Sequence, residues 1–328
     1  MLVSVIIPMY NVAGLVERCA RSLLSQTCSD MELIFVDDGS TDATVDVLQQ
    51  CLADESRRDV VVKLLRHEVN RGCAMARLTG MKAATGEYMV QVDSDDYVET
   101  GYIEHLVAQA VSTQADVVMC DYYVLQPDGE HVVNISLPAK TEDCLCLFLQ
   151  SKLHNGLWNK LIRSRLITDN QIYPIEGMNM YDDKSVMVRV MHYAQSISHL
   201  SEPLYHYNRT NAASLSLRSK SCEIDDALAL VKLIDDFYAS REVSSQVRES
   251  IIYHKAHVMG MVLLHAQNPG HLDEADRYLK SIAAAKIWRN PMSSWYYKLV
   301  LLAHKCHLRP IETLLRWATA RHAKKNMK

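Results

Sequence analysis

The chain has 328 residues, of which 48% are hydrophobic and 23% charged, a composition typical of a soluble globular protein. No apolar run approaches the roughly 18–20 residues that a membrane-spanning helix needs, and the N-terminus lacks the basic start of a signal peptide. The nine cysteines are odd in number and scattered, without zinc spacing, which favours reduced thiols in a cytoplasmic protein over a disulfide framework.

The net charge of −4 is unevenly distributed. Residues 289–328 carry nine Lys or Arg and one acid, so this segment is +8 and the preceding 288 residues carry −12. A basic tail on an acidic body indicates an anionic partner for the tail alone. No aromatic residues alternate with a basic groove, so we expect no nucleic-acid partner.

The basic tail has the pattern of an amphipathic helix over residues 311–325. Its apolar and basic residues fall at helical spacing: Ile311, Leu314, Leu315 and Ala318 beside Arg316, Arg321, Lys324 and Lys325. Trp288, Trp295 and Trp317 are candidate anchors at the level of lipid headgroups. The pattern predicts peripheral contact with an anionic membrane, at the inner face of the cytoplasmic membrane. It equally allows a helix packed on the protein with a solvated basic face.

Strand-like and helical segments alternate through the first 125 residues. The pattern predicts strands over 3–7, 32–36, 60–65, 88–92 and 117–120, and helices over 15–24, 42–52, 74–84 and 102–110. Such alternation is typical of an α/β fold with a mainly parallel, doubly wound sheet. The pattern loosens between 126 and 215 and is helical from 222, so we predict one domain over 1–215 and a helical domain over 216–328.

Polar residues follow three of the predicted strands. They are Asp37-Asp38, Asn70-Arg71-Gly72 and Asp93-Ser94-Asp95-Asp96. Open α/β sheets bind ligands beyond the carboxyl ends of their strands, so these positions are the expected site. Three carboxylates within four residues favour a hard cation, Mg²⁺ or Mn²⁺, whose shell a diphosphate would complete. A solvated acidic turn accounts for the same residues equally well.

A carboxylate at Asp37 or Asp38 can accept a hydrogen bond from a base N–H or a ribose hydroxyl. Turn chemistry and helix capping explain this segment as well. A receiver-type domain also places acids after its strands, but it leaves residues 93–96 and everything after 125 unexplained.

Five short segments occur in a distinctive order. They are Pro8-Met9-Tyr10-Asn11, Val36-Asp37-Asp38-Gly39-Ser40-Thr41-Asp42, Asn70-Arg71-Gly72 with Ala76-Arg77, Gly86-Glu87-Tyr88, and Asp93-Ser94-Asp95-Asp96. In this order and at these separations they resemble the family 2 glycosyltransferases, inverting enzymes with the GT-A fold. The resemblance covers residues 3–215.

The resemblance implies roles for the donor side of the site. The loop with Pro8, Tyr10 and Asn11 would hold the nucleobase, together with Asp38, which accepts the imide N–H, and its neighbour Asp37. Arg71 and Arg77 would contact base or phosphate. Asp93 and Asp95 of the Asp-x-Asp motif would serve ribose and metal, with Ser94 and Asp96 beside them. Leu78 departs from the Asn that the family usually has after Ala-Arg.

The resemblance also implies an acceptor side. Trp158, Asn159 and Lys160 match the family's Trp-Asn-Lys element in the acceptor region. Asp182 and Asp183 align with the pair that carries the catalytic base, and the second position makes Asp183 the base, with Asp182 supporting it. Arg209 matches an Arg that neutralises the leaving diphosphate.

The expected enzyme is therefore a hexosyltransferase that moves a sugar from a nucleotide-sugar donor to a hydroxyl of a glycan or lipid-linked glycan in surface polysaccharide synthesis. A UDP-sugar is the expected donor. Two other classes remain open: a nucleotidyltransferase, which should show a glycine-rich basic phosphate loop after the first strand, and a non-catalytic sugar-nucleotide-binding module. Pro8-Met9-Tyr10-Asn11 is no such phosphate loop. Retention of both acidic motifs argues against the binding module.

Overall fold

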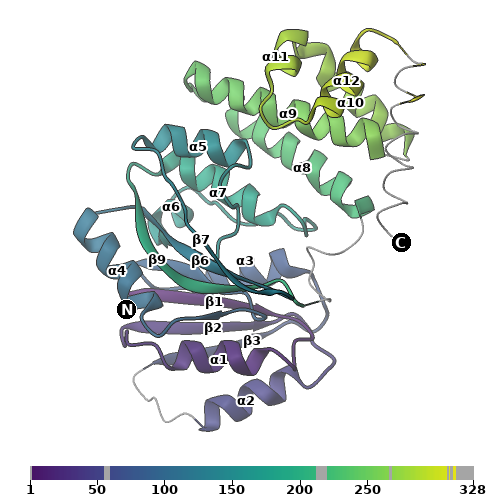
Figure 1. Ribbon diagram of the computed structural model, residues 1–328. Coiled ribbons are helices and arrows are strands. Elements are labelled where there is room, and N and C mark those ends of the chain that lie inside the picture. The colour runs from purple at the N-terminus through teal and green to yellow at the C-terminus, as the bar shows by residue number, and fades with distance from the viewer. Residues whose placement is uncertain are drawn as a thin grey trace. The chain divides into compact units, whose positions relative to one another are not determined.

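The computed structural model describes residues 2–54, 60–211, 220–265, 268–308, 310 and 313–314 (Figure 1). The chain forms two compact units, and each is described by itself. The first comprises residues Met1–Cys144 and Asn155–Arg218, and the second Leu145–His154 and Ser219–Lys328. Most of the amphipathic segment 311–325 lies outside the described residues.

A nine-stranded sheet forms the centre of the first unit, with strand order β3-β2-β1-β4-β8-β6-β9-β5 and β7 paired to β6. The strands are β1 Val3–Met9, β2 Met31–Asp37, β3 Val61–Arg66, β4 Tyr88–Gln91, β5 Tyr97–Val98, β6 Val117–Gln126, β7 Gly129–Val133, β8 Lys160–Arg163 and β9 Ile197–Asn208. The helices of this part of the chain are α1 Val16–Leu24, α2 Thr44–Asp54, α3 Cys73–Ala83, α4 Tyr102–Thr113, α5 Thr141–Leu149, α6 Ser164–Thr168 and α7 Asp182–Tyr193.

The sheet has a parallel half and a mixed half. Strands β3, β2, β1 and β4 are all parallel. Beyond them β8 runs antiparallel to both β4 and β6, while β6 and β9 are parallel to each other. The predicted α/β class is confirmed. The sequence pattern did not predict β5, β7, β8 or β9, which are short, exposed or bulged and carry no clean apolar period.

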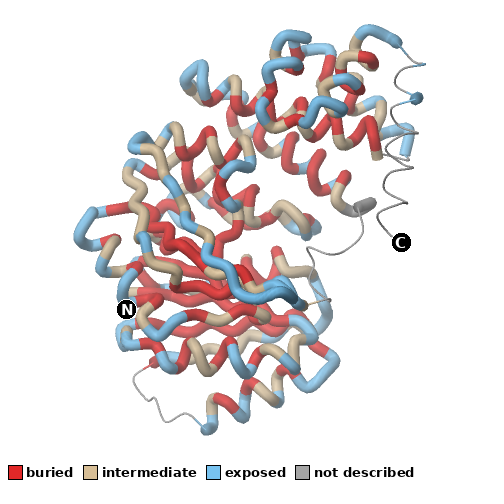
Figure 2. Tube along the Cα trace, in the orientation of Figure 1, coloured by how far each residue is buried: buried red, intermediate tan, exposed pale blue. Residues whose placement is uncertain are grey.

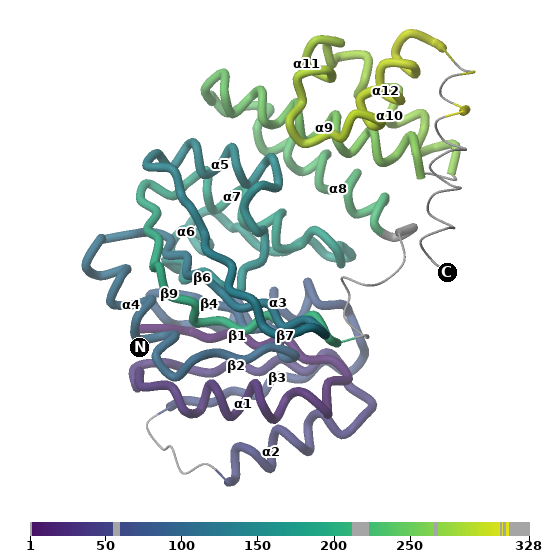
Figure 3. The backbone as a smooth tube through the Cα atoms, viewed as in Figure 1, coloured from purple at the N-terminus to yellow at the C-terminus, as the bar shows by residue number. Residues whose placement is uncertain are grey.

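Helices cover both faces of the parallel half (Figures 1 and 3). Odd-numbered residues of β1 and β2, such as Val5 and Phe35, pack in one core with α1 and α4. Even-numbered Ile34 and Val36 pack on the opposite face against Ala76 of α3. Because both faces are covered, β1 and β2 are buried along their whole length (Figure 2), which explains their continuous apolar runs.

The second unit is helical. It contains α8 Lys220–Tyr238, α9 Ser245–His265, α10 Pro269–Ser281, α11 Ala284–Arg289 and α12 Trp295–Lys305. Helix α9 contacts all four others, and twelve of its residues are buried. Within the described residues, no helix is both long and apolar enough to cross a bilayer.

Gly86 allows the turn before β4 to lie directly against β1. A Cβ at this position would stand 2.6 Å from the backbone nitrogen of Ser4 and 2.8 Å from the carbonyl carbon of Val3. The Ser4 hydroxyl also accepts a hydrogen bond from the Gly86 amide at 2.8 Å. Contact with backbone cannot be relieved by a side-chain rotation, so the strand itself would have to move.

We therefore expect Gly86→Ala to lower the free energy of unfolding by about 1–3 kcal/mol, the usual cost of overpacking. Urea unfolding of the two proteins measures it. Gly14→Ala is the matched control, because a Cβ there meets no atom within 4 Å. Equal losses in both variants would mean that the close approach at Gly86 is not the cause.

Candidate active site

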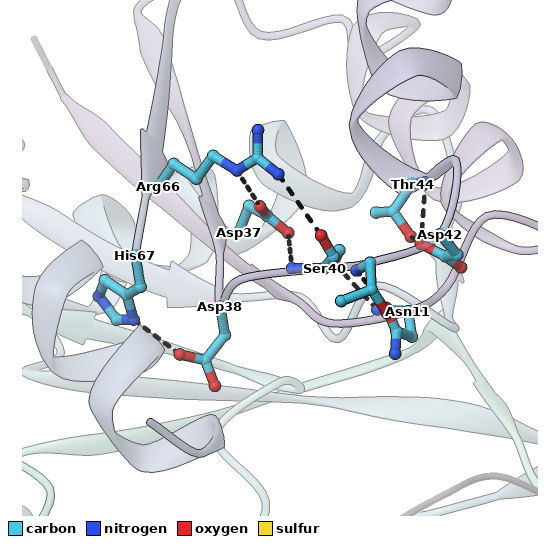
Figure 4. A network of polar contacts seen from close by, with 9 residues as sticks. Asn11, Asp37, Asp38, Ser40, Asp42, Thr44, Arg66 and His67 are labelled. Carbon is cyan, nitrogen blue, oxygen red and sulfur yellow. Dashed lines mark hydrogen bonds and ion pairs between the residues drawn. The ribbon is translucent and has the colours of Figure 1, made fainter. Parts of the chain in front are cut away.

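The loops after β1, β2, β3 and β4 meet at one edge of the sheet, because these four strands are parallel. The first two loops are hydrogen-bonded to each other (Figure 4). The Asn11 amide donates to the Ser40 hydroxyl at 3.0 Å, and the Thr41 amide donates to Asn11 Oδ1 at 2.9 Å. These bonded residues are 29 and 30 positions apart in the sequence, and the two motifs thus form one structural unit. Of the first loop, Pro8 is buried within β1 and Tyr10 is exposed at the edge.

Asp37 and Asp38 are both buried and hold the surrounding loops in place. Asp37 accepts from the Ser40 amide at 3.1 Å and is ion-paired with Arg66 at 3.0 Å. Asp38 accepts from His67 Nδ1 at 2.7 Å (Figure 4). It also accepts from the Arg71 amide at 2.9 Å and from the Gly72 amide at 2.7 Å. Asp38, which is predicted to accept a hydrogen bond from the nucleobase, therefore also anchors the loop that carries Arg71.

Arg66 and His67 were not among the predicted site residues. They lie at the carboxyl end of β3, where open α/β sheets bind ligands, so their position after a predicted strand was the available signal. His67 Nε2 lies 2.9 Å from the Thr79 hydroxyl, so the ring connects Asp38 to helix α3. A hollow of about 440 Å³ beside these residues is lined by Gly39, Ser40, Thr41, Arg66, His67 and Glu68. Gly39 has a φ of 73° and its Cα lies against the Val69–Asn70 backbone, where any Cβ would clash.

Arg77 is the central cation of the site. Its Nη1 donates to Asp182 and Asp183, each at 2.5 Å, and its Nη2 donates to Asp93 at 2.8 Å. The guanidinium side chain is only 7% exposed. Asp93 lies about ninety residues before Asp182 and Asp183, the pair predicted to include the catalytic base. All three carboxylates nevertheless contact the same guanidinium. The prediction that Arg77 contacts base or phosphate did not anticipate this bridge.

In the Asp-x-Asp turn, Asp96 is bonded to strand β9 and plays a different part from Asp93 and Asp95. Both oxygens of Asp96 are used by β9: the Tyr205 hydroxyl donates to one at 2.6 Å and the Asn208 amide to the other at 2.7 Å. Burial, reinforced by the Asp95 and Asp93 charges, raises the pKa of Asp96 well above its usual range. Asp96 is thus engaged in holding the turn to β9, and Ser94 is buried beside it.

Asp93 and Asp95 are the carboxylates of this turn that fit a metal. Both are half-buried, and burial followed by the Asp93 charge raises the pKa of Asp95. A cation between them would relieve this repulsion. In the part of the chain that the structure describes, no group of three or more His, Cys, Asp or Glu side chains is arranged so that it could hold a metal ion by itself. Two carboxylates suit Mg²⁺ or Mn²⁺, which typically complete their shell with phosphate oxygens and water.

Asp182 and Asp183 open helix α7, where the helix dipole favours negative charge. The Asp182 side chain is 5% exposed and that of Asp183 is 22% exposed. Burial raises the pKa of Asp183, and so does the adjacent Asp182, while Arg77 opposes the shift. Of the pair, Asp183 is therefore the carboxylate that a molecule in solution can reach.

Trp158, Asn159 and Lys160 are all buried, and their contact with an acceptor stays a prediction. The Trp158 ring stacks on Tyr205 and Tyr207, with centroids 4.5 and 5.2 Å apart. The Asn159 amide donates to the Cys120 carbonyl at 3.0 Å, and Lys160 Nζ donates to Asn159 Oδ1 at 2.6 Å. The polar groups of Asn159 and Lys160 thus find hydrogen-bond partners inside the protein.

Two arginines of the predicted site remain exposed. The Arg71 guanidinium lies 3.3 Å from Glu176. The Arg209 amide donates to the Leu125 carbonyl at 3.0 Å, which fixes its backbone at the end of β9. Both side chains are accessible to an anionic ligand.

Comparison with known proteins shows the family of this chain. The family model "Glycosyl transferase family 2" matches residues 4–187, more than half of the chain. The chain belongs to glycosyl transferase family 2. It is therefore an enzyme that transfers sugars.

Individual relatives agree with the family. EpsH of Bacillus subtilis (strain 168), named as a glycosyltransferase, is 27% identical to this glycosyltransferase over 256 residues, 76% of this chain and 72% of EpsH. EpsJ of the same organism, also named as a glycosyltransferase, is 34% identical over 223 residues, 66% of this chain and 63% of EpsJ.

Solved structures show the GT-A type of fold. The structure of S. aureus TarS 1–349 in complex with UDP-GlcNAc superposes with a TM-score of 0.74 at 17% identity, covering 98% of this chain and 92% of that one. The mannosyltransferase PcManGT from Pyrobaculum calidifontis superposes with a TM-score of 0.56 at 19% identity, covering 99% of this chain and 86% of that one. The predicted fold and family of the glycosyltransferase are confirmed.

The Arg77 bridge generates a prediction. Arg77→Met should lower the free energy of unfolding by about 3–5 kcal/mol, because it leaves buried carboxylates without their counter-charge. Arg77→Lys keeps the charge but not the fork that reaches three carboxylates, so turnover should fall at least about tenfold. Urea unfolding and sugar transfer measure the two effects.

Arg163→Lys is the matched control, since Arg163 contacts Glu87 and Asp116 away from this edge of the sheet. It should retain turnover. Normal turnover in Arg77→Lys would show that the bridge is not needed for the reaction.

Proposed function

We propose that this glycosyltransferase inverts the anomeric centre of a UDP-sugar as it transfers the sugar to a glycan hydroxyl. The observation that carries the proposal is the Arg77 bridge between Asp93 on the donor side and Asp183 on the acceptor side. A single displacement needs a leaving-group site and a base close to one reacting carbon. Residues 1–215 are proposed as the catalytic domain and 216–328 as a helical domain.

The donor is proposed to lie over the edge formed by the first four loops. The accessible groups there are Tyr10 and Asn11, the exposed guanidinium of Arg71, and Asp93 and Asp95. Uridine is favoured because the TarS structure that superposes with a TM-score of 0.74 was solved in complex with UDP-GlcNAc. PcManGT was solved with GDP-Man and Mn²⁺, which supports use of a divalent metal by this fold.

Asp93 and Asp95 would hold the metal, and a divalent cation there would neutralise charge on the departing diphosphate. Arg209, exposed at the end of β9, is proposed to add a second positive charge to that group. The role of Asp96 is proposed to be indirect: through Tyr205 and Asn208 it fixes the turn on which Asp95 stands.

Asp183 is the proposed base. It would accept the proton of the acceptor hydroxyl as that oxygen attacks the anomeric carbon, so that no covalent sugar–enzyme intermediate forms. A base works best with a pKa near the working pH, and burial raises the pKa of Asp183 in that direction. Asp182, which shares Arg77 and is buried, is proposed to position its neighbour.

The acceptor is proposed to be a glycan or lipid-linked glycan of a surface polysaccharide, with the enzyme working at the inner face of the cytoplasmic membrane. The relatives EpsH and EpsJ are consistent with sugar transfer but name no acceptor. The basic tail predicted to contact the membrane lies mostly outside the described residues.

Asp183→Asn should reduce sugar transfer at least about 100-fold, the lower range for loss of a general base. UDP and metal binding should be retained, because the metal ligands are on the other side of Arg77. Transfer assays and calorimetry measure the two properties. Near-normal transfer by Asp183→Asn, with an inactive Asp182→Asn, would assign the base to Asp182 instead.

The pH profile tests the same assignment. Transfer should increase with pH as Asp183 loses its proton, and this increase should lie above the ordinary range of an aspartate because its pKa is raised. Asp182→Asn removes a negative charge that raises this pKa, so the profile should shift to lower pH. A shift to higher pH, or none, would contradict the charge coupling between the two residues.

Asp95→Ala should abolish turnover together with the metal dependence of UDP binding. Calorimetric titration of UDP with and without Mn²⁺ measures this dependence. In the unsubstituted enzyme, Mn²⁺ should increase UDP affinity, because the cation links carboxylate and diphosphate. Equal affinity with and without metal would refute the metal site.

A further inference from the structure

Exposed large apolar side chains are concentrated in one stretch of the helical unit. Between residues 288 and 308 the structure exposes Trp288 (61%), Trp295 (70%), Tyr296, Leu299 and Leu308. In the sheet unit, by contrast, the exposed ones are scattered singly over separate elements: Tyr10, Val61, Val69, Val111 and Val132. A concentration of this kind marks an interaction surface.

Helix α12 is apolar on two opposite sides. Val300, Leu301 and Ala303 are buried, in a helix that packs on α9 and α10. On the other side, an apolar row recurs at i, i+4, i+7 and i+11: Trp295, Leu299, Leu302 and Cys306 are exposed or half-buried. A helix on the surface of a globular unit normally turns polar residues outward, so this outer row requires a second apolar environment.

The surroundings of the outer row are positively charged. Lys298 and Lys305 lie seven residues apart on α12, along one side of that row. Residues 277–311 contain seven Lys or Arg and no Asp or Glu. Acids of α9 and α10 do pair with some of them, Glu249 with Lys286 and Asp276 with Lys280. These pairs partly neutralise the stretch, and the charge beside the outer row itself comes from Lys298 and Lys305.

We propose that the α11–α12 surface, made by Trp288, Arg289, Trp295, Lys298 and Leu299, docks onto the headgroup region of an anionic lipid bilayer. Tryptophan rings are favoured at the boundary between headgroups and acyl chains. Lysine and arginine side chains beside them are attracted to anionic lipids. The inference builds on the proposed membrane location and gives it a defined site in the described part of the chain.

Charge distinguishes this partner from two others that could cover the surface. In a two-fold dimer through this face, the same cations would meet themselves and repel. Residues 309–328 of the chain carry six Lys or Arg and one acid, so they have the same sign as the surface. The apolar row of α12 favours a lipid over a nucleic acid, which offers no acyl layer for Leu299.

The test is sedimentation of the full chain with vesicles, without nucleotide or acceptor. Vesicles are phosphatidylcholine alone or with about one third phosphatidylglycerol, whose charge should attract the basic residues. The protein should bind only the anionic vesicles, and salt should weaken the binding. Trp295→Ser combined with Leu299→Ser should lower the partition coefficient at least about tenfold. Lys298→Gln should lower it mainly at low salt.

Two control variants match these changes on other elements. Val111→Ser removes an exposed apolar side chain from α4, and Lys232→Gln an exposed lysine from α8. Both should bind vesicles normally. Quenching of Trp288 and Trp295 fluorescence by brominated phospholipid, compared with Trp288→Phe and Trp295→Phe, should show directly that these rings reach the acyl boundary.

Several outcomes would overturn the proposal. One is unchanged binding by the Trp295→Ser/Leu299→Ser variant. Another is loss of binding on deletion of residues 309–328 alone, which would assign the contact to the tail. A concentration-dependent dimer that this double variant abolishes would assign the surface to a second copy. Duplex DNA binding that needs Lys298 but not Trp295 would make nucleic acid the partner. Because no donor is present, each result leaves the proposed sugar transfer untouched.

Discussion

One buried guanidinium holds the two halves of this site together. The parallel half of the sheet supplies Asp93, while Asp182 and Asp183 come from α7, far along the chain, and Arg77 of α3 contacts all three. Three carboxylates so close together, and largely out of water, would repel strongly without a cation. Only Arg presents enough donors in a fixed fork to reach several carboxylates at once. One side chain therefore fixes Asp93 relative to Asp183, the proposed base.

The same logic explains the aromatic core on the mixed half of the sheet. Asp96 is buried, and it is tolerated because the Tyr205 hydroxyl and the Asn208 amide satisfy both of its oxygens. Tyr205 must then be rigid, and it is held by the Trp158 ring stacked against it. Through Tyr205, Trp158 thus helps to hold the Asp-x-Asp turn in place, which gives the Trp-Asn-Lys element a structural role.

The sequence predicted the parallel half of the fold and most of the donor edge. Residues such as Val5 and Phe35 lie in long apolar runs, and polar residues after parallel strands necessarily meet at one edge. The sequence could not predict the mixed half, because β5, β8 and β9 are defined by long-range pairing and not by local periodicity. It also could not reveal the Arg77 bridge or the burial of Lys160. Both depend on which residues become neighbours in space, and neither has a signature in the spacing of residues along the chain.

The buried Lys160 and Asp183 influence each other's charge. Burial lowers the pKa of Lys160 to about 7, while the Asp183 charge acts in the opposite direction. Asp183 in turn has a raised pKa, which the Lys160 charge opposes. The two groups therefore each favour the charged form of the other, although burial favours the neutral form of both. Protonation of Asp183 would remove the negative charge that raises the pKa of Lys160, and would therefore favour neutral Lys160. Protonation of Asp183, the proposed base, is thus coupled to the charge of the buried Lys160, in addition to its direct contact with Arg77.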